Sequence, residues 1–252
     1  MTGDHALARD LAQEAGRRLV GLRAQGGDPD VLRKAGDRLS HEFLVAELAD
    51  RRPGDVVLSE EGADHPARLS ARRVWIVDPL DGTREFGEPG RTDWAVHVAL
   101  WERGAGDLTA GAVALPAQDR VLSTLEPPPP PDAAGASAGL RIVVSRSRAP
   151  QFVRNISDLL GAELVPLGSA GAKVAAVVGG EVDAYVHGGG FYEWDTAAPV
   201  AVARAAGLHA SRIDGSALAY NQADLLMPDI LVCRPAVAGV LLSAIREVTD
   251  AS

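Results

Sequence analysis

The first fifty residues show the periodicity of two helices. Apolar residues recur at steps of three and four between Leu7 and Leu22, which predicts an amphipathic helix over residues 4–23. Similar spacing predicts a second helix over residues 38–50. The chain therefore begins with helices and not with strands.

After Pro53 and Gly54 the pattern changes to that of strands. Short runs rich in β-branched and aromatic residues, bounded by Gly, Pro or Asp, are typical of strands. Such runs lie at residues 56–58, 74–77, 94–101, 111–115 and 120–124. The first half of the chain is thus predicted to be α+β, with helices followed by strands.

A low-complexity segment, residues 127–139, separates the two halves. It holds five consecutive prolines followed by small and polar residues, which predicts an exposed connection. Beyond it the patterns alternate, as in a layered α/β structure. Strands are predicted at residues 141–145, 163–167, 182–187, 208–213 and 230–233, and helices at residues 149–160, 169–178, 195–206 and 235–248. We therefore expect two domains, residues 1–132 and 133–252.

Composition and charge narrow the classes of function. With 252 residues, 46% of them hydrophobic, the chain can bury a substantial core. It carries 25 Lys and Arg against 34 Asp and Glu, a net charge of −9. This charge disfavours polymeric nucleic acid and an acidic membrane surface as partners. A small anionic ligand stays compatible with it, provided that a metal ion or a local basic group neutralises the ligand.

The single cysteine and the lack of long apolar runs suggest the compartment. Cys233 has no partner for an internal disulfide, and its apolar neighbours predict a buried, inert thiol. No apolar run approaches the roughly 18 residues of a membrane span, and the first ten residues lack the apolar core of a signal peptide. We expect a cytoplasmic protein.

The most informative stretch is Asp78-Pro79-Leu80-Asp81-Gly82, which follows a predicted strand. Pro79 fixes one backbone angle and Gly82 permits close backbone approach, so the two carboxylates can converge on one point. Paired carboxylates and a turn carbonyl are hard oxygen ligands of the kind that Mg²⁺ prefers. The alternative is an ordinary turn that closes a strand.

Two other acidic positions could join this cluster. Glu60 and Glu61 also follow a predicted strand, and acids gathered at one edge of a sheet repel each other unless cations neutralise them. Asp195 opens a helix and could add a ligand to the same metal. Taken alone, the acidic pair would be a solvated loop and Asp195 the N-cap of its helix.

In this order along the chain, these motifs resemble the lithium-sensitive, Mg²⁺-dependent inositol monophosphatase superfamily: Glu60-Glu61, Asp78-Pro79-Leu80-Asp81-Gly82-Thr83 and Trp194-Asp195. The continuation Thr83-Arg84-Glu85-Phe86 is similar to the Thr-Lys-Glu-Phe of its bisphosphate nucleotidase branch, and above all to the actinobacterial CysQ-like enzymes. The resemblance implies a layered αβαβα sandwich of the inositol monophosphatase and fructose-1,6-bisphosphatase type, with the carboxylates at the domain boundary.

The resemblance also implies roles for individual residues. Two or three Mg²⁺ ions would be bound by Glu60, Asp78, the Leu80 carbonyl, Asp81 and Asp195. The catalytic residues would be Asp37, Glu60 and Thr83, with Asp37 bonded to Thr83 and orienting the attacking water. Without the resemblance, Asp37 would be interpreted as a helix cap.

Substrate contacts are implied for the second half of the chain. Gly168-Ser169-Ala170-Gly171-Ala172-Lys173 and Ser145-Arg146-Ser147-Arg148 resemble nucleotide-contacting stretches of the bisphosphate nucleotidases, although Arg148 stands where those enzymes often have His. The implied contacts are Asp81, Gly82, Thr83, Ser145, Arg148, Gly168, Ser169, Lys173 and Asp195.

The basic residues and histidines add to this interpretation. Only Lys34 and Lys173 are lysines among the 25 basic residues, which favours a phosphate contact for Lys173 over an ordinary surface position. Four histidines show no spacing that indicates catalysis, and we expect structural roles for them: His41, His97, His187 and His209.

The resemblance finally implies a reaction. The expected activity is hydrolysis of the 3′-phosphate of adenosine 3′,5′-bisphosphate to AMP and phosphate, which clears a by-product of sulfate assimilation. 3′-Phosphoadenosine 5′-phosphosulfate is the expected second substrate. An inositol monophosphatase or fructose-1,6-bisphosphatase is the nearest alternative, and a non-catalytic phosphate- or Mg²⁺-binding protein is a more distant one. The expected partner is a small phosphorylated nucleotide, and the chain is expected to be a monomer or a homodimer.

Overall fold

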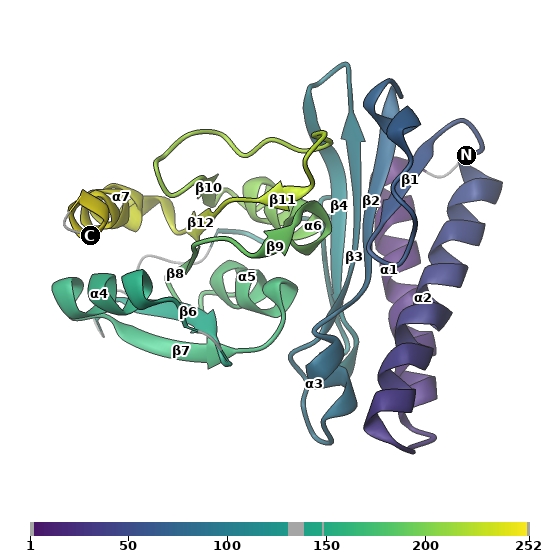
Figure 1. Ribbon diagram of the computed structural model, residues 1–252, viewed down its shortest axis with the longest axis horizontal. Coiled ribbons are helices and arrows are strands. Elements are labelled where there is room, and N and C mark those ends of the chain that lie inside the picture. The colour runs from purple at the N-terminus through teal and green to yellow at the C-terminus, as the bar shows by residue number, and fades with distance from the viewer. Residues whose placement is uncertain (1–2, 131–138, 148, 251–252) are drawn as a thin grey trace.

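The computed structural model, which describes residues 3–130, 139–147 and 149–250, has five layers (Figure 1). Helices α1 (Asp4–Arg23) and α2 (Pro29–Arg51) form one outer layer and cover the first sheet. Helices α5 (Ala170–Val178) and α6 (Glu193–Ala205) lie between the two sheets. Helices α4 (Gln151–Leu160) and α7 (Pro235–Asp250) close the far side. The predicted αβαβα sandwich is confirmed.

Each half of the chain supplies one five-stranded sheet. The first has the order β1 (Val56–Ser59), β2 (Arg73–Asp81), β3 (Ala95–Glu102), β4 (Asp107–Leu115), β5 (Arg120–Ser123), with only β1 and β2 parallel. The second has the order β10 (His209–Ser211), β12 (Ile230–Cys233), β8 (Ala184–His187), β6 (Arg141–Ser145), β7 (Glu163–Leu167). Strands β9 (Phe191–Tyr192) and β11 (Leu226–Met227) form a separate two-stranded antiparallel sheet, which the sequence did not indicate.

Strand β2 shows why the apolar runs of the first sheet are unbroken. Successive side chains of a strand point to opposite faces, and helices cover both faces of this sheet. Trp75 and Val77 therefore pack toward α1 and α2, whereas Val74 and Ile76 pack toward the central layer. The end of β2 is thus fixed from both sides, and this end carries the Asp78 motif.

The outermost core lies between the second sheet and helices α4 and α7. Leu231 and Cys233 of β12 contribute to it together with Leu241 and Ile245 of α7. Cys233 is fully buried, and burial raises the pKa of its thiol to about 12. The predicted burial of this thiol is confirmed.

Helix α2 begins earlier than predicted, and this difference matters for the site. Its N-cap is Asp28, whose carboxylate accepts from the backbone N–H groups of Asp30 and Val31 at 3.0 and 3.1 Å, followed by Pro29 in the first turn. Gly36 interrupts the helical pattern in the sequence, but in the structure it lets Phe86 and Leu80 approach the helix closely. Asp37 therefore lies inside α2, and its interpretation as a helix cap was wrong.

The proposed division at residue 132 stays a prediction, because this boundary lies outside the described residues. The central core contains residues of both sheets and of α5 and α6. Among the described residues, no helix is long and apolar enough to cross a membrane.

Candidate active site

Two of the acidic side chains come from the irregular end of β2. Along β2 the pairing moves from Asp78 opposite His97 to Asp81 opposite Ala95, so one extra residue of β2 is accommodated in a bulge. The bulge falls on Pro79 and Leu80. It turns the chain so that Asp78 and Asp81, both buried, lie near the same point.

The third acid of the cluster comes from the first turn of α6. Asp195 is not the N-cap of this helix, as the simplest interpretation of the sequence had it. The N-cap is Tyr192, whose backbone N–H donates to Asp195 Oδ2 at 2.6 Å. One carboxylate oxygen of Asp195 thus accepts the N-cap hydrogen bond of α6. Ligand atoms of Asp78, Asp81 and Asp195 lie within 4.8 Å of one another.

Glu60 completes the acidic cluster from the end of β1. Although its side chain reaches solvent, its carboxyl is within hydrogen-bonding distance of Asp78. Burial among protein atoms and the charge of Asp195 raise the pKa of Glu60 to about 7. Burial and the charge of Glu60 raise the pKa of Asp78 well above its ordinary value, and burial and Asp81 raise the pKa of Asp195 to about 6.

Burial and the charges of neighbouring carboxylates both oppose ionisation of Glu60, Asp78 and Asp195. Asp78 Oδ2 is buried and has no hydrogen-bond partner among the described residues, which is costly for a carboxylate oxygen. A divalent cation bound by oxygen ligands would neutralise the cluster and satisfy this oxygen. The residues present therefore fit a Mg²⁺ site.

Asp81 differs from its neighbours because it has several donors. Ala170 and Gly171, in the first turn of α5, donate to its two oxygens at 3.2 and 2.6 Å. His97 Nε2 lies 3.2 Å from Asp81 Oδ2. Burial alone would raise the pKa of Asp81, but His97 and the Gly171 N–H outweigh burial and lower it.

A second pair of polar residues lies beside the cluster. Thr83 follows Gly82, which has a φ of 83° and caps the short helix α3 (Thr83–Gly87). The Thr83 hydroxyl donates to the Leu80 carbonyl at 2.9 Å and contacts Asp37 Oδ1 at 3.3 Å. Burial and the charge of Glu61 raise the pKa of Asp37 to about 6. Helix α2 thus delivers a proton acceptor to the motif.

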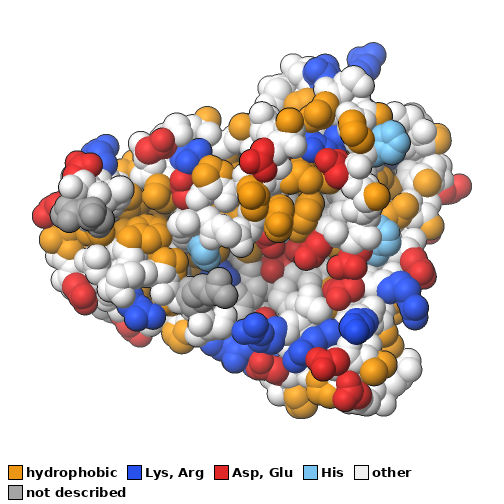
Figure 2. Space-filling model, in the orientation of Figure 1, with side chains coloured by type: hydrophobic (Ala, Val, Ile, Leu, Met, Phe, Trp, Pro, Cys, Tyr) orange, Lys and Arg blue, Asp and Glu red, His pale blue; other side chains and the backbone are white. Residues whose placement is uncertain are grey.

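The site opens into a pocket of about 310 Å³ between the two halves of the chain. Figure 2 shows acidic side chains gathered in a hollow on this face and basic side chains along its edge. The basic residues that line the pocket are Arg84, Arg146 and Lys173. Arg146 pairs with Glu85 and Glu88, whereas Arg84 is exposed and has no ion-pair partner among the described residues.

The loop before α5 forms one wall of this pocket. Ser169 caps α5 by accepting from the Ala172 N–H at 2.9 Å, and Lys173 donates to the Gly168 carbonyl. Lys173 is only 4% exposed, so its interpretation as a surface lysine was wrong. Burial lowers the pKa of Lys173.

Comparison with known proteins identifies the family to which this chain belongs. The chain matches the inositol monophosphatase family over residues 5–250. The chain belongs to the inositol monophosphatase family. A 3′-phosphoadenosine 5′-phosphate phosphatase of Mycobacterium leprae is 51% identical over 97% of this chain and 94% of its own length.

More distant relatives match this chain over most of their length. The 3′(2′),5′-bisphosphate nucleotidase CysQ of Escherichia coli K12 is 30% identical over 84% of this chain and 91% of its own length. The crystal structure of CysQ from Bacteroides thetaiotaomicron matches with a TM-score of 0.78 at 28% identity. That match covers 92% of this chain and 97% of the other.

Most residues that the resemblance implied for this family come together in one place. Asp78, Asp81 and Asp195 form the cluster, and Glu60 interacts with all three. Thr83 contacts both Asp37 and the Leu80 carbonyl. The pocket is also lined by Gly82, Ser145, Gly168, Ser169 and Lys173. Arg148 lies outside the described residues.

Several residues of the site were not identified from the sequence. Tyr185, His187 and Phe191 line the pocket, and His97 contacts Asp81 although it was expected to be merely structural. These residues come from several elements of both halves of the chain, and no local motif indicates that they come together. His41 and His209 instead bond to Ser59 and Ser211, as expected of structural histidines.

Proposed function

We propose that this protein is a Mg²⁺-dependent phosphatase that hydrolyses the 3′-phosphate of adenosine 3′,5′-bisphosphate to AMP and phosphate. The observation that carries the proposal is a cluster of carboxyl groups, Glu60, Asp78, Asp81 and Asp195, with the Asp37–Thr83 contact beside it. Asp81 and Asp195 line a pocket that Arg84, Arg146 and Lys173 also line. The similarity to the mycobacterial phosphatase supports this choice of substrate.

The metal-binding part of the proposal assigns two or three Mg²⁺ ions to Glu60, Asp78, the Leu80 carbonyl, Asp81 and Asp195. The Leu80 carbonyl accepts one hydrogen bond from Thr83 and keeps a second lone pair for a cation. The chemistry supplied by bound Mg²⁺ is a lowered pKa for a water ligand and positive charge near the phosphate and the leaving oxygen.

The residues around the cluster prepare the attacking water. Thr83 has one hydroxyl hydrogen, and the Leu80 carbonyl, at 2.9 Å, is the nearer of its two acceptors. Asp37 can therefore accept a proton from a water that is bonded to the Thr83 oxygen. The pKa of Asp37, about 6, suits a general base near neutral pH. Glu60, whose pKa is raised to about 7, is assigned the same role.

The second phosphate of the substrate is assigned to the wall formed by Gly168, Ser169 and Lys173. The first backbone N–H groups of α5 are already bonded to Asp81 and Ser169, so they are not free donors for a phosphate. The Ser169 side chain and the nearby cations remain. Arg84, which has no ion-pair partner in the described part of the chain, is the cation best able to approach this phosphate.

The wider context of the proposal follows from the substrate. An enzyme of this activity would clear a by-product of sulfate assimilation and could also accept 3′-phosphoadenosine 5′-phosphosulfate. Lithium inhibition, a cytoplasmic location and a monomeric or homodimeric state remain predictions.

The test of this proposal compares phosphate release from three substrates in the presence of Mg²⁺. Adenosine 3′,5′-bisphosphate should have the highest kcat/KM, ahead of inositol 1-phosphate and fructose 1,6-bisphosphate. A higher kcat/KM for either of the other two would replace the proposed substrate. Binding of all three without phosphate release would indicate a non-catalytic protein.

A further inference from the structure

Asp93, in the first half of the chain, accepts two hydrogen bonds from the loop that carries Gly168 and Ser169. The Gly168 N–H donates to Asp93 Oδ2 at 2.6 Å, and the Ser169 N–H donates to the Asp93 carbonyl at 3.2 Å. Asp93 is only 5% exposed. A residue just before β3 thus fixes two consecutive backbone groups of the proposed phosphate-binding wall.

Asp93 is itself held by Arg91. Arg91 Nε donates to Asp93 Oδ1 at 2.8 Å, and Arg91 Nη2 donates to Oδ2. A planar guanidinium that binds both oxygens fixes the orientation of the carboxylate as well as its position. The direction in which Asp93 accepts the Gly168 N–H therefore depends on Arg91.

The surroundings of the loop leave it little room for another position. A Cβ on Gly168 would lie 2.5 Å from Glu85 Cγ and 2.8 Å from Asp93 Oδ2. A Cβ on Gly82 would lie 2.9 Å from the Ser169 side chain. The loop is therefore packed between the motif that carries Thr83 and the Arg91–Asp93 pair.

We propose that Arg91 and Asp93 are positioning residues that set the affinity of this enzyme for the second phosphate of its substrate. The inference rests on the proposed function, because it requires that the Gly168–Ser169 loop receives that phosphate. Neither residue lines the active-site pocket, so the pair acts through Gly168 and Ser169 and does not touch the substrate.

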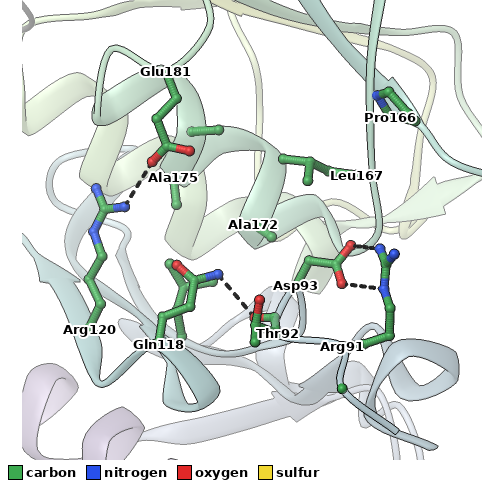
Figure 3. A pocket seen from close by; sticks show the side chains of 13 residues that line it. Arg91, Thr92, Asp93, Gln118, Arg120, Pro166, Leu167, Ala172, Ala175 and Glu181 are labelled. Carbon is green, nitrogen blue, oxygen red and sulfur yellow. Dashed lines mark hydrogen bonds and ion pairs between the residues drawn. The ribbon is translucent and has the colours of Figure 1, made fainter. Parts of the chain in front are cut away.

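A matched control residue lies in the same part of the molecule. Arg91 and Asp93 line a cavity of about 420 Å³ that is distinct from the active-site pocket. Figure 3 shows the Arg91–Asp93 pair at one end of this cavity and the Arg120–Glu181 pair at the other. No described hydrogen bond or ion pair joins Arg120 to the loop, so Arg120→Ala removes a comparable charge without loosening Gly168.

The experiment measures two constants at saturating Mg²⁺ for the wild type, Arg91→Ala, Asp93→Asn and Arg120→Ala. One is the KM of adenosine 3′,5′-bisphosphate, and the other is the inhibition constant of adenosine 3′-monophosphate, which lacks the second phosphate. In Arg91→Ala and Asp93→Asn the KM should rise about tenfold more than the inhibition constant, the loss expected for one charge-assisted hydrogen bond. Arg120→Ala should leave the ratio of the two constants unchanged.

A purely structural pair would weaken both ligands equally or lower only the melting temperature, and either result overturns the inference. Amide hydrogen exchange provides a readout that needs no substrate. Exchange at Gly168 and Ser169 should become faster in Arg91→Ala and not in Arg120→Ala; unchanged exchange also overturns the inference. The two proposals can fail separately. If the wild type does not hydrolyse the bisphosphate, the proposed function is contradicted. Faster exchange in Arg91→Ala would still show that Arg91 and Asp93 hold the loop in place.

Discussion

Mg²⁺ binding to the carboxylate cluster should release protons, so the affinity for Mg²⁺ should rise with pH. The pKa of Glu60 is raised to about 7 by burial and by Asp195, and that of Asp195 to about 6 by burial and by Asp81. Carboxylates bind a hard cation in their ionised form. Protons therefore compete with Mg²⁺ over the range in which these two groups titrate.

The pKa values of Glu60 and Asp195 set the size of this effect. If both groups must ionise, the apparent Kd for Mg²⁺ should fall about a hundredfold between about pH 5.5 and about pH 7.5. Glu60 reaches solvent, which screens its interactions, so a fall between about tenfold and about a hundredfold is expected. Near pH 6.5 the two groups together hold about one proton that Mg²⁺ displaces. Asp78, whose pKa is also raised by burial and by Glu60, adds to the release.

Isothermal titration calorimetry in two buffers with different ionisation enthalpies measures this proton release directly. Asp195→Asn should reduce the number of protons released. Asp107→Asn should not, because Asp107 pairs with Arg204 away from the cluster. A Kd for Mg²⁺ that is independent of pH, with no proton released near pH 6.5, would refute the assignment of these residues as ligands.

Stability should follow the same linkage. A carboxyl whose pKa is raised by folding binds more protons in the folded than in the unfolded state. Without Mg²⁺, the free energy of unfolding should therefore fall as pH rises from about 4 to about 7, the interval between the unfolded and folded values of Glu60 and Asp195. The rise in melting temperature on adding Mg²⁺ should accordingly be larger near pH 7.5 than near pH 5.5. Equal shifts at both pH values would contradict this linkage.

Three substitutions test other parts of the site. Asp37→Asn should lower kcat at least about a hundredfold with little change in KM, because it removes a proton acceptor and keeps its shape; steady-state kinetics with near-normal kcat would exclude that role. Gly36→Ala would place a methyl group 2.8 Å from the Phe86 ring and should cost about 1–3 kcal/mol in the free energy of unfolding, measured by denaturant titration. Lys173→Ala should lower kcat/KM for the bisphosphate more than for inositol 1-phosphate, and an equal loss for both would remove it from the second-phosphate site.

The central motif of the site could be predicted because its residues are close together in the sequence. Asp78, Asp81 and Thr83 lie within six consecutive residues whose Pro and Gly restrict the backbone, and helix spacing alone identified α1 and α7. The pairing of Asp195 with these residues came from the family resemblance. No spacing rule joins positions more than a hundred residues apart.

The remaining features depend on tertiary contacts. Helix α2 was predicted too short because Gly36 breaks the pattern, and only its contact with Phe86 explains a glycine there. Lys173 is buried by the packing of α5 between the two sheets, which no local pattern indicates. Arg91 and Asp93 carry no motif, and their role is visible only where the other half of the chain meets them.

The most direct test of the central claim identifies the products formed from adenosine 3′,5′-bisphosphate. The purified protein is incubated with this substrate and Mg²⁺, and the nucleotide product and free phosphate are separated and quantified. We expect adenosine 5′-monophosphate and phosphate in equal amounts from the wild type, and neither product from Asp81→Asn. Release of adenosine 3′-monophosphate instead, or undiminished activity in Asp81→Asn, would contradict it.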